Sequence, residues 1–365
     1  MYDFVIVGAG FSGATFARIM SDRGKKCVVI DKRDHIAGNC YTKYIEGTHI
    51  HVYGPHIFHT SDDDVWNFVN QYTKFNAFIN RPKAIANNVV YSLPINMMTL
   101  QQLWGVTNPI DARRTLEQVT QRFKAMYPTP QNAEEWALTQ VGDEIYETLI
   151  KGYSTKQWMR TPDKLPASIL KRIPIRLTWD DNYYNDKYQG IPVNGYTPIF
   201  ERLLEGIEVK LSTDFVLEKG LLERLGRKIV YTGSLDELHG YVHGDLDYRT
   251  LKFENVTFNE DHQGNAVMNY PSLNVPWTRK IEHKHFNVTH NTVWSTSIVT
   301  TETPDQWSRG KIPYYPINDE TNERLHKKYR NMTSDKYIVA GRLGRYRYLD
   351  MHQAIASAMK IANEH

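Results

Sequence analysis

Three glycines near the N-terminus, with an acidic residue after them, are suited to binding the phosphates and ribose of a dinucleotide. Gly8, Gly10 and Gly13 stand in the string GAGFSG, between an apolar β-branched run and a run with helical spacing. The first glycine permits a tight turn, the second lets the backbone approach a pyrophosphate, and the third lets helix and strand pack closely. Asp31 ends the next apolar run, where a carboxylate accepts hydrogen bonds from ribose hydroxyls and disfavours a 2′-phosphate. The pattern predicts a dinucleotide site that does not take NADP.

The end of the chain repeats this arrangement. Residues 337–362 read as a strand, a glycine turn and a helix. Asp350 stands where it would cap that helix, whose positive N-terminus would face an electron-rich ring. The two terminal segments together favour bound FAD over a transient nicotinamide cofactor. Lys32, Gly38 and Asn39 follow Asp31 and are expected to continue along the cofactor.

Four histidines lie close together in residues 49–59. Their spacings of two and three suggest a metal site, but no cysteine or carboxylate completes a ligand set, so no metal is predicted. His49 and His51 alternate along an expected strand. His56 and His59 follow a Gly-Pro turn and are expected to reach the flavin ring.

Aromatic and arginine side chains in the middle of the chain have two interpretations each. Tyr153 and Trp158 either pack in a core or line a pocket for a sugar nucleotide. Arg172, Arg249 and Arg279 are either solvated surface residues or, if they converge, bidentate ligands of a diphosphate. Spacing alone leaves both interpretations open.

Motifs that would place the chemistry on the protein are absent from the sequence. There is no G-x-S-x-G nucleophile turn, no H-E-x-x-H zinc motif and no phosphate-binding P-loop. No pair of carboxylates stands out as a glycosidase dyad. The chemistry is therefore expected to reside on the cofactor.

The periodicity along the chain predicts an α/β fold: a Rossmann-like FAD-binding domain with an inserted helical domain and an antiparallel β-sheet layer. Helices are expected at residues 62–73 and, between Pro and Gly breaks, at 99–105, 109–127, 133–153 and 167–173. Antiparallel strands are expected within residues 249–300. The domain bounds follow: residues 1–80, 190–245 and 316–365 for the FAD-binding domain, 97–185 for the helical domain with a mobile lid at about 161–180, and 81–96 with 246–315 for the sheet domain.

Composition restricts the class of protein. The chain has 365 residues, 41% of them hydrophobic and 23% charged, as in ordinary globular proteins. Its net charge of +3 is too small to indicate a nucleic-acid partner. Cys27 and Cys40 imply no disulfide framework, and no leader or apolar run of membrane-spanning length is present. We expect a cytoplasmic protein without a membrane partner.

Eight strings, in order along the chain, closely resemble those of bacterial UDP-galactopyranose mutases. They are GPHIFHT, KGYSTKQW, LKRIP, DDNYYNDKYQGIP, GNAVMNY, TRKIEHKHF, PYYPIND and RYRYLDMHQ, from residue 54 to residue 353. The resemblance extends over essentially the whole chain, and these strings are far more specific than the glycine motif.

The resemblance implies an isomerase that interconverts UDP-galactopyranose and UDP-galactofuranose without net redox change. It implies non-covalent FAD that is active in its reduced form, so an external reductant is needed. Flavin N5 would be the nucleophile at the anomeric carbon, with UDP as the leaving group. A homodimer, and a product used for cell-surface polysaccharide, are implied in the same way.

The resemblance also implies roles for individual residues. Arg172, Arg279 and His59 match catalytic positions. The cofactor-binding positions are Gly8, Gly10, Phe11, Ser12, Gly13, Asp31, Lys32, Gly38, Asn39, His56, Ile57, His59, Arg342, Leu349, Asp350 and Met351. The substrate-binding positions are Asn80, Tyr153, Ser154, Trp158, Arg172, Tyr183, Arg249, Asn269, Arg279, Tyr315 and Tyr348.

Departures from the family pattern mean that the sequence does not define which sugar the substrate carries. Ser154, Met159 and Pro55 stand where relatives differ, which could extend activity to UDP-N-acetylgalactosamine. The alternatives are an amine-oxidase-type flavin oxidoreductase, which shares the two-ended flavin domain, and a catalytically silent nucleotide-sugar binder. An oxidase would consume oxygen with its substrate, whereas a mutase would turn over only after reduction.

Overall fold

The computed structural model describes residues 1–171, 174–287 and 296–365, which form two compact units. Unit 1 comprises Met1–Ala77, Asp186–Tyr248 and Arg309–His365. Unit 2 comprises Phe78–Asn185 and Arg249–Ser308. The expected helical and sheet segments both fall in unit 2, and their separation into two domains remains a prediction.

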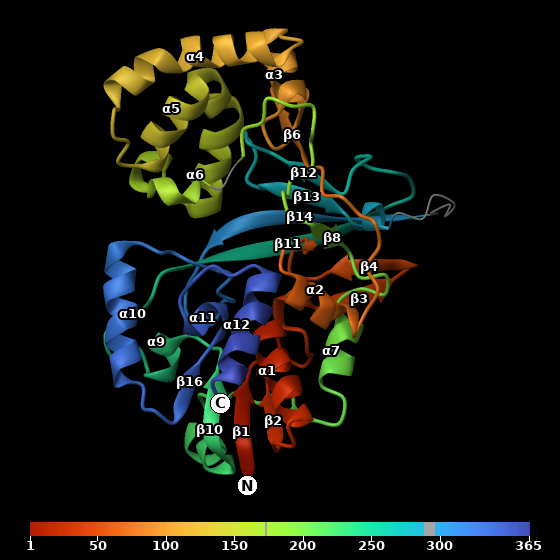
Figure 1. Ribbon diagram of the computed structural model, residues 1–365, viewed down its shortest axis with the longest axis vertical. Helices are drawn as coiled ribbons and strands as arrows, with labels where there is room; N and C mark the ends of the chain where they lie inside the picture. Colours follow the sequence, from red (N-terminus) through yellow and green to blue (C-terminus); the bar gives the residue numbers. More distant parts are fainter. Residues whose placement is uncertain (172–173, 288–295) are drawn as a thin grey trace. The chain divides into compact units, whose positions relative to one another are not determined.

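Unit 1 is built on a five-stranded parallel sheet with the order β16-β10-β1-β2-β9 (Figure 1). The strands are β1 (Tyr2–Val7), β2 (Cys27–Ile30), β9 (Glu208–Lys210), β10 (Gly226–Tyr231) and β16 (Tyr337–Val339). Their apolar, β-branched residues suit strands that are buried on both faces. Each of the three chain segments of unit 1 supplies at least one strand, so the chain leaves this sheet and returns to it twice.

Helices α1 (Phe11–Asp22) and α12 (Met351–Asn363) pack against each other in unit 1, although they stand at opposite ends of the sequence (Figure 1). Their buried faces join one core with α7 (Thr197–Leu203) and the parallel strands. The predicted helix at 62–73 is confirmed as α2 (Asp63–Asn70), and the Asp62 side chain caps it by accepting from Asp64 N and Val65 N. The remaining helices of unit 1 are α8 (Lys219–Leu222), α9 (Leu235–Leu238), α10 (Glu320–Met332) and α11 (Gly341–Gly344).

Short strands complete unit 1. The hairpin of β3 (Thr42–Ile45) and β4 (Thr48–His51) confirms the predicted alternation of His49 and His51. A second antiparallel pair joins β5 (Phe58–Thr60) to β8 (Tyr188–Gly190), and β15 is Tyr315–Pro316.

The helical segments of unit 2 are α3 (Met97–Trp104), α4 (Pro109–Met126), α5 (Ala133–Ile145), a π-helical segment (Tyr146–Lys151) and α6 (Gly152–Trp158). The helix predicted over 133–153 is interrupted, because the backbone of Gly142 is not helical and the π-helical segment follows. Side chains of Asn96, Asn108 and Asn132 cap α3, α4 and α5. The helix expected at 167–173 is wrong: the described part is a single 3₁₀ turn, Ala167–Ile169, between Pro166 and Pro174, which confine it.

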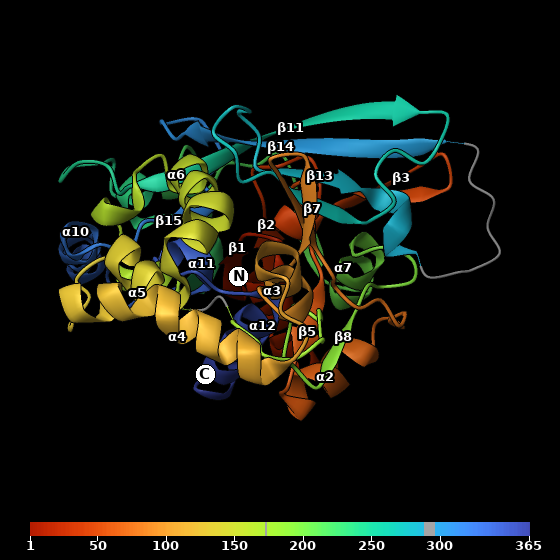
Figure 2. The same ribbon diagram turned by 90° about the horizontal axis from the view of Figure 1, so that it is seen from above.

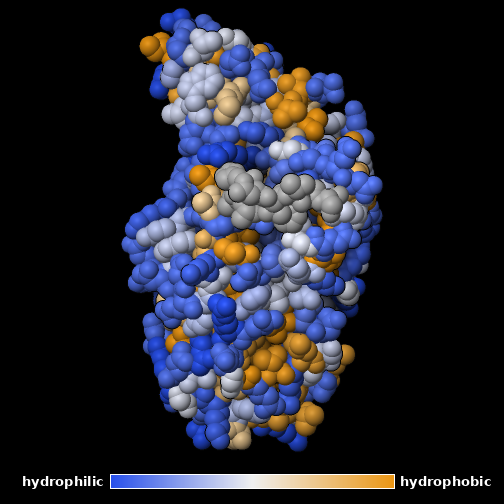
Figure 3. Space-filling model, turned by 90° about the vertical axis from the view of Figure 1, so that its right-hand side faces the viewer, coloured by the Kyte–Doolittle hydropathy of each residue, from blue (hydrophilic) through white to orange (hydrophobic). Residues whose placement is uncertain are grey.

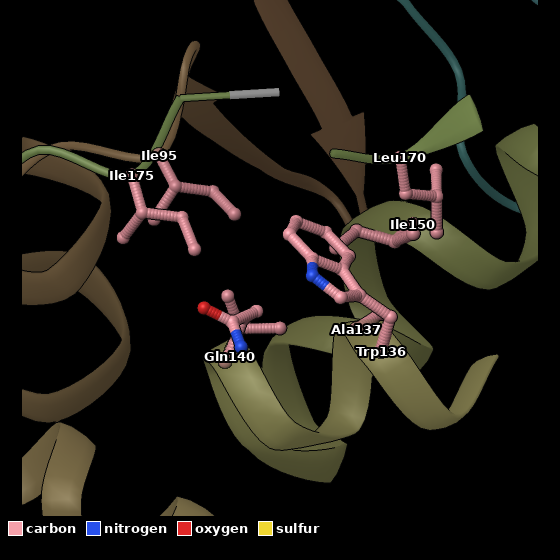
Figure 4. Close-up of a pocket in the computed structure, with 8 residues that line it drawn as sticks. Ile95, Trp136, Ala137, Gln140, Ile150, Leu170 and Ile175 are labelled. Carbon is pink, nitrogen blue, oxygen red and sulfur yellow. The ribbon is translucent and has the colours of Figure 1, made fainter. Parts of the chain in front are cut away.

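The helices of unit 2 enclose a hydrophobic core with a small gap, where Trp136 and Gln140 of α5 face Ile95 and Ile175 (Figure 4). The gap measures about 10 Å³, enough for one water molecule at most. Around these residues the described core is therefore closely packed.

The sheet of unit 2 has the strand order β11-β14-β13-β12-β6-β7. Its strands are β6 (Lys83–Ala86), β7 (Val89–Ser92), β11 (Tyr248–Phe258), β12 (Val267–Asn269), β13 (Arg279–Glu282) and β14 (Ser297–Gln306). The two longest, β11 and β14, run antiparallel side by side (Figure 2). Two expectations are corrected: β12 pairs with β6 in parallel, and residues 283–286 form a 3₁₀ turn in place of a strand.

The 3₁₀ turn carries a buried histidine whose titration predicts a pH effect on stability. His283 Nε2 lies 2.7 Å from Thr300 Oγ1, and burial lowers the pKa of His283 to about 3. An unfolded histidine takes a proton near pH 6.5. Between those values the unfolded state binds more protons, so the free energy of unfolding falls as the pH falls, by up to about 1.4 kcal/mol per unit from this group.

We therefore expect His283→Asn to flatten the dependence of the urea-unfolding free energy on pH between 6.5 and 5. Carboxylates and other histidines titrate alike in the two proteins, so their contributions cancel when the slopes are compared. This includes the neighbouring His285, whose pKa is raised by a hydrogen bond with Glu282. Equal slopes in the two proteins would contradict the buried neutral state of His283.

The surface is mainly hydrophilic on the face that Figure 3 shows, with hydrophobic side chains in separate groups. Exposed large apolar residues are scattered along the sequence, among them Ile110, Leu217 and Leu273. Within the described ranges, no helix combines the length and apolarity needed to cross a membrane.

Candidate active site

The glycine turn after β1 has the geometry expected of a dinucleotide site. Gly8 has a φ of +107°, and a Cβ there would lie 2.1 Å from Thr232 Oγ1. A Cβ on Gly13 would lie 1.9 Å from the Gly8 carbonyl oxygen. These two positions must be glycine for the turn to form. Gly10 differs, because a Cβ there would meet only the Cα of Gly38, at 3.8 Å.

Helix α1 opens toward this turn with an N-terminus suited to an anion. Its N-cap is Gly10, no side chain caps it, and no acidic residue lies in its first turn. The backbone N–H groups and the positive end of the helix dipole therefore remain available to a phosphate.

Asp31 is buried and oriented by the backbone around it. Its Oδ2 accepts from Ala9 N at 2.8 Å and its Oδ1 accepts from Arg33 N at 2.9 Å. Each carboxylate oxygen has a second lone pair, as recognition of a ribose diol requires. Nearby, Arg33 Nη2 donates to Asn39 Oδ1, while its buried Nη1 has no partner among the described residues. The backbone at Gly10 and Gly38 carries no side chain, and the Arg33 Nη1 group is a donor without a partner among the described residues. Both features fit the adenosine and pyrophosphate of FAD.

Other predicted cofactor residues have structural surroundings. Phe11 and Ile57 are buried, Ser12 lies in the first turn of α1, and the Met351 side chain packs against the core of unit 1. The Lys32 side chain is 55% exposed and pairs with Glu237 at 3.3 Å. Lys32 thus offers its backbone more readily than its ammonium group to the cradle.

The histidines of residues 49–59 are tied into hydrogen bonds. His51 Nδ1 accepts from the backbone N–H of His56, and His56 Nδ1 lies 2.7 Å from the Gly54 carbonyl oxygen. His59 Nδ1 lies 2.6 Å from Asp186 Oδ2, and Ser61 Oγ donates to Asp186 Oδ1 at 2.9 Å.

The environment of Asp186 fixes the state of this pair. Burial raises the pKa of Asp186, but hydrogen bonds from His59 and Ser61 outweigh it, so the pKa lies below its ordinary value. Asp186 is therefore a carboxylate at neutral pH, and His59 Nδ1 must carry the proton that it donates. Asp186 is not among the predicted site residues, because it lies 127 positions from His59.

His59, Asp350 and His352 are close enough to bind a cation, since one ligand atom of each lies within 4.8 Å of the others. Existing contacts already occupy two of the three. His59 is paired with Asp186, and Asp350 forms a capping box with Gln353 at the start of α12. Burial and the neighbouring His59 lower the pKa of His352. The predicted capping role of Asp350 is confirmed.

Arg342 holds the segment that precedes α12. Its Nη2 donates to the Leu349 carbonyl oxygen at 2.6 Å and its Nη1 to that of Tyr314 at 3.1 Å. The guanidinium lies 4.8 Å from the Tyr348 ring centre and 5.9 Å from that of Tyr315. The two tyrosine rings stack with centres 5.7 Å apart. The cation thus holds Tyr315 and Tyr348, two of the substrate-binding tyrosines that the resemblance implies, in one arrangement.

Unit 2 aligns three polar residues across adjacent strands. Asn269 of β12 stands opposite Arg279 of β13, which stands opposite Glu302 of β14. Arg279 donates through Nε to Glu302 Oε1 at 2.9 Å and through Nη2 to Oε2 at 2.7 Å. Glu302 is fully buried. This bidentate pair fixes the plane of the guanidinium, and Asn269 Nδ2 is held by the Lys83 carbonyl oxygen at 3.3 Å.

Arg249 lies on β11 of the same sheet, opposite Gln306, which is four residues along β14 from Glu302. Its Nη1 and Nη2 donate to Gln306 Oε1 at 2.9 and 3.2 Å, and Arg249 is 97% buried. Glu302 and Gln306 are absent from the predicted residues, although their even spacing in the run 302–306 indicates a shared face.

The other predicted substrate residues also fall in unit 2. Asn80 is buried, and its carbonyl oxygen accepts from the backbone N–H of Tyr183 at 2.8 Å. Ser154 is buried in α6, which also carries Tyr153. Trp158 packs against the helical core, in agreement with the core-packing interpretation of this residue. Arg172 lies outside the described residues. Of the predicted lid, Ile175 pairs with Ile95 and Arg176 N donates to the Ile95 carbonyl oxygen; its mobility stays a prediction.

Comparison with known proteins decides the family. The family model for UDP-galactopyranose mutase matches residues 148–348, and an NAD(P)-binding Rossmann-like domain model matches residues 6–72. The chain is 44% identical to a probable UDP-galactopyranose mutase from Klebsiella pneumoniae, over 99% of this chain and 94% of that protein. This chain belongs to the UDP-galactopyranose mutase family.

A further curated protein and a solved structure are also similar to this chain. A dTDP-fucopyranose mutase from Escherichia coli is 39% identical over 99% of this chain and 98% of its own length. A crystal structure of reduced UDP-galactopyranose mutase covers 100% of this chain and 95% of its own, with a TM-score of 0.75 at 14% identity. It supports the predicted fold class, Rossmann-like with an added sheet and helices.

Membership in the UDP-galactopyranose mutase family establishes the general activity. The chain is an isomerase that interconverts the pyranose and furanose rings of a nucleotide sugar, and its cofactor is FAD. The oxidoreductase alternative is not the activity of this family.

Proposed function

We propose that this protein interconverts UDP-galactopyranose and UDP-galactofuranose with reduced FAD. The observation that carries the proposal is the 44% identity, over nearly the full length of both chains, to a probable UDP-galactopyranose mutase. The bidentate Arg279–Glu302 pair, on a sheet that also holds Arg249, suits a diphosphate leaving group.

FAD, when bound and reduced, supplies the nucleophile for the anomeric carbon. The residues that would hold it are the glycine turn, Asp31, Gly38 and Asn39. The N-terminus of helix α1 stabilises the negative charge of the pyrophosphate. The Asp31 carboxylate accepts hydrogen bonds from the ribose hydroxyls. His59, fixed by Asp186, presents its imidazole in one tautomer to the reaction site.

The arginines stabilise the negative charge that develops on the leaving group. UDP departs with negative charge on the diphosphate, and Arg279, whose guanidinium plane Glu302 fixes, stabilises that charge. Tyr183, Tyr315 and Tyr348 donate phenolic hydroxyls to the phosphates. Tyr153 stacks on the uracil, Trp158 lies beside the sugar, and Asn80, Ser154 and Asn269 make further substrate contacts. Arg172 supplies a second cation on the basis of sequence alone.

The test is an anaerobic assay of the holoenzyme with UDP-galactopyranose, with and without dithionite, in which chromatography separates pyranose from furanose. We expect furanose only in the reduced sample, with the sugar unchanged in oxidation state. Oxygen consumption by the oxidised enzyme with substrate would support an oxidase and overturn the proposal.

Parallel assays with two other nucleotide sugars test which sugar and which nucleotide the natural substrate contains. The 39% identity to a dTDP-fucopyranose mutase makes dTDP-fucose the second candidate, and Ser154 and Met159 motivate UDP-N-acetylgalactosamine as a third. Ranking of kcat/KM across the three substrates identifies the natural one. A higher value with dTDP-fucose would replace UDP-galactose in the proposal.

The setting follows from the proposed chemistry. We infer a homodimer that works in the cytoplasm and receives electrons from an external reductant, because the reaction itself supplies none. The support is the family resemblance. Size-exclusion chromatography with light scattering tests the dimer, and a monomer at micromolar concentration would contradict it.

The His59–Asp186 pair yields a specific prediction for turnover. Asp186→Asn replaces a carboxylate, which only accepts, by an amide that presents either an N–H or an oxygen to His59 Nδ1. The tautomer of His59 is then no longer fixed, and we expect kcat to fall about tenfold or more, as when a histidine loses its orienting carboxylate.

Ser61→Ala is the matched control for this pair, because it removes the other hydrogen bond to Asp186 and leaves the carboxylate in place. Its kcat should stay within about threefold of wild type, with FAD content unchanged in both variants. Equal effects of the two substitutions would argue that the pair merely holds the fold.

A further inference from the structure

A single lysine of α6 gathers four backbone carbonyl oxygens from one loop of unit 2. Lys156 Nζ lies 2.6 Å from the carbonyl oxygen of Tyr270, 2.7 Å from that of Ser272, 3.1 Å from that of Val275 and 2.7 Å from that of Trp277. An ammonium group has three N–H donors, so at least one of them is shared. Four carbonyl dipoles that point at one place repel each other unless a cation lies between them.

The loop that Lys156 holds, residues 270–277, connects two strands of the proposed substrate site. Asn269 is the last residue of β12, and Arg279 is the first of β13. The helix that carries Lys156 also carries Tyr153, Ser154 and Trp158. Lys156 therefore joins the predicted uracil- and sugar-contacting helix to the predicted phosphate-contacting strands.

Gly152 provides an independent sign of the same close approach. A Cβ on Gly152 would lie 2.2 Å from the Pro271 carbonyl oxygen, a distance that atoms do not adopt. Helix α6 thus meets the loop through backbone at its first residue, Gly152, and through Lys156 one turn later. The two contacts fix both the separation and the rotation of the helix relative to the loop.

The surroundings of Lys156 explain why a positively charged side chain stands at this position. Burial lowers the pKa of Lys156 to about 8, while the carbonyl oxygens favour the charged form, so the group is an ammonium at neutral pH. Lys280 of β13 lies over the rings of Tyr270 and Trp277, and burial raises the pKa of the Tyr270 phenol, which stays neutral. A buried charge is costly to the fold, and here the carbonyl oxygens of the loop backbone stabilise it.

We propose that Lys156 is a positioning residue for nucleoside-diphosphate binding, which aligns α6 with the 270–277 loop so that both sides of the site meet the same ligand. The inference rests on the proposed function, since the roles of Tyr153 and Arg279 come from it. Lys156 does not touch the ligand. Its effect is on affinity, because alignment of residues distant from the reacting atoms contributes equally to ground-state and transition-state binding.

The test compares Lys156→Met with wild type as the FAD-loaded full chain. Isothermal titration with UDP gives Kd, and the dithionite-reduced assay with UDP-galactopyranose gives kcat and KM. We expect Kd and KM to rise about tenfold or more while kcat stays within about threefold. Lys156→Arg keeps the charge and should recover most of the lost affinity.

Lys151→Met is the matched control, because Lys151 lies one turn earlier and pairs with Glu147 instead of the loop. It should leave Kd and KM unchanged. Unchanged UDP affinity in folded Lys156→Met, or a loss of melting temperature with no change in KM, overturns the inference. If Lys156→Met does not fold, Gly152→Ala displaces the same loop, and normal UDP affinity in that variant overturns it equally.

Failure of the proposed function would look different. A wild-type enzyme that binds UDP but does not isomerise UDP-galactopyranose contradicts the proposed substrate, while the loss of UDP binding in Lys156→Met would still support the role of Lys156. Titration with dTDP in parallel covers the case in which the natural nucleotide is thymidine-based.

Discussion

Arg279→Ala is expected to lower kcat/KM about 10³-fold while FAD remains bound. A guanidinium that stabilises charge on a departing phosphate is worth this much or more, because it interacts with the charge that develops in the transition state. FAD content should not change, since Arg279 is not among the residues of the glycine turn and Asp31 that form the dinucleotide cradle. The measurement is the reduced-enzyme assay together with the flavin absorbance of the purified variant.

The partner of Arg279 complicates this substitution in a way that the structure makes testable. Removal of the arginine leaves Glu302, a fully buried carboxylate, without its bidentate partner. Loss of one member of a buried ion pair costs about 3–5 kcal/mol of stability. Low activity in the single variant would therefore have two explanations, loss of the diphosphate contact and loss of the fold.

The double variant Arg279→Ala/Glu302→Gln separates the two explanations. A neutral amide removes the unpaired charge, so the melting temperature should recover toward wild type, whereas activity should stay about 10³-fold low. Recovery of activity together with stability would show that Arg279 supports the sheet and does not contact the substrate. Arg172→Ala, prompted by sequence alone, should give the same loss of turnover with bound FAD.

The parts of the fold that local sequence dictates were predictable. Strands β1, β2 and β10, helix α1 and the closing helix α12 follow from apolar runs, glycines and caps that lie within a few residues. Helix α10 was not predicted, because its residues are mostly polar and Tyr329 and Asn322 are its only buried ones. The helix expected at 167–173 failed because two prolines outweigh its short apolar pattern.

The candidate site divides in the same way. The close approach of Gly13 to Gly8 and the Asp350 cap involve neighbours in sequence, and both have the predicted geometry. Other contacts of the site join residues that are far apart: Asp31 accepts from Ala9 N, 22 positions away, and Asp186, Glu302 and Lys156 act on residues 127, 23 and at least 114 positions away. Such pairs depend on how strands and helices are brought together, which no periodicity in one segment records.

Gly10→Val should yield a folded protein that binds no FAD. Gly10 has φ −84° and ψ −177°, an extended conformation open to any residue, and its Cβ would meet only Gly38 Cα at 3.8 Å. The polypeptide therefore tolerates the side chain. The added methyl groups instead occupy the space through which the backbone approaches the pyrophosphate, so we expect FAD content below about a tenth of wild type.

Gly13→Ala tests the opposite case on the same turn. Its Cβ would lie 1.9 Å from the Gly8 carbonyl oxygen, so it should disrupt the packing of α1 on β1 and reduce the yield of folded protein. Gly10→Val, in contrast, should melt with the midpoint of wild-type protein stripped of FAD, because ligand binding alone accounts for the difference from the holoenzyme. A flavin-loaded Gly10→Val would mean that the pyrophosphate lies elsewhere, and an unfolded one that Gly10, like Gly13, is required by the turn itself.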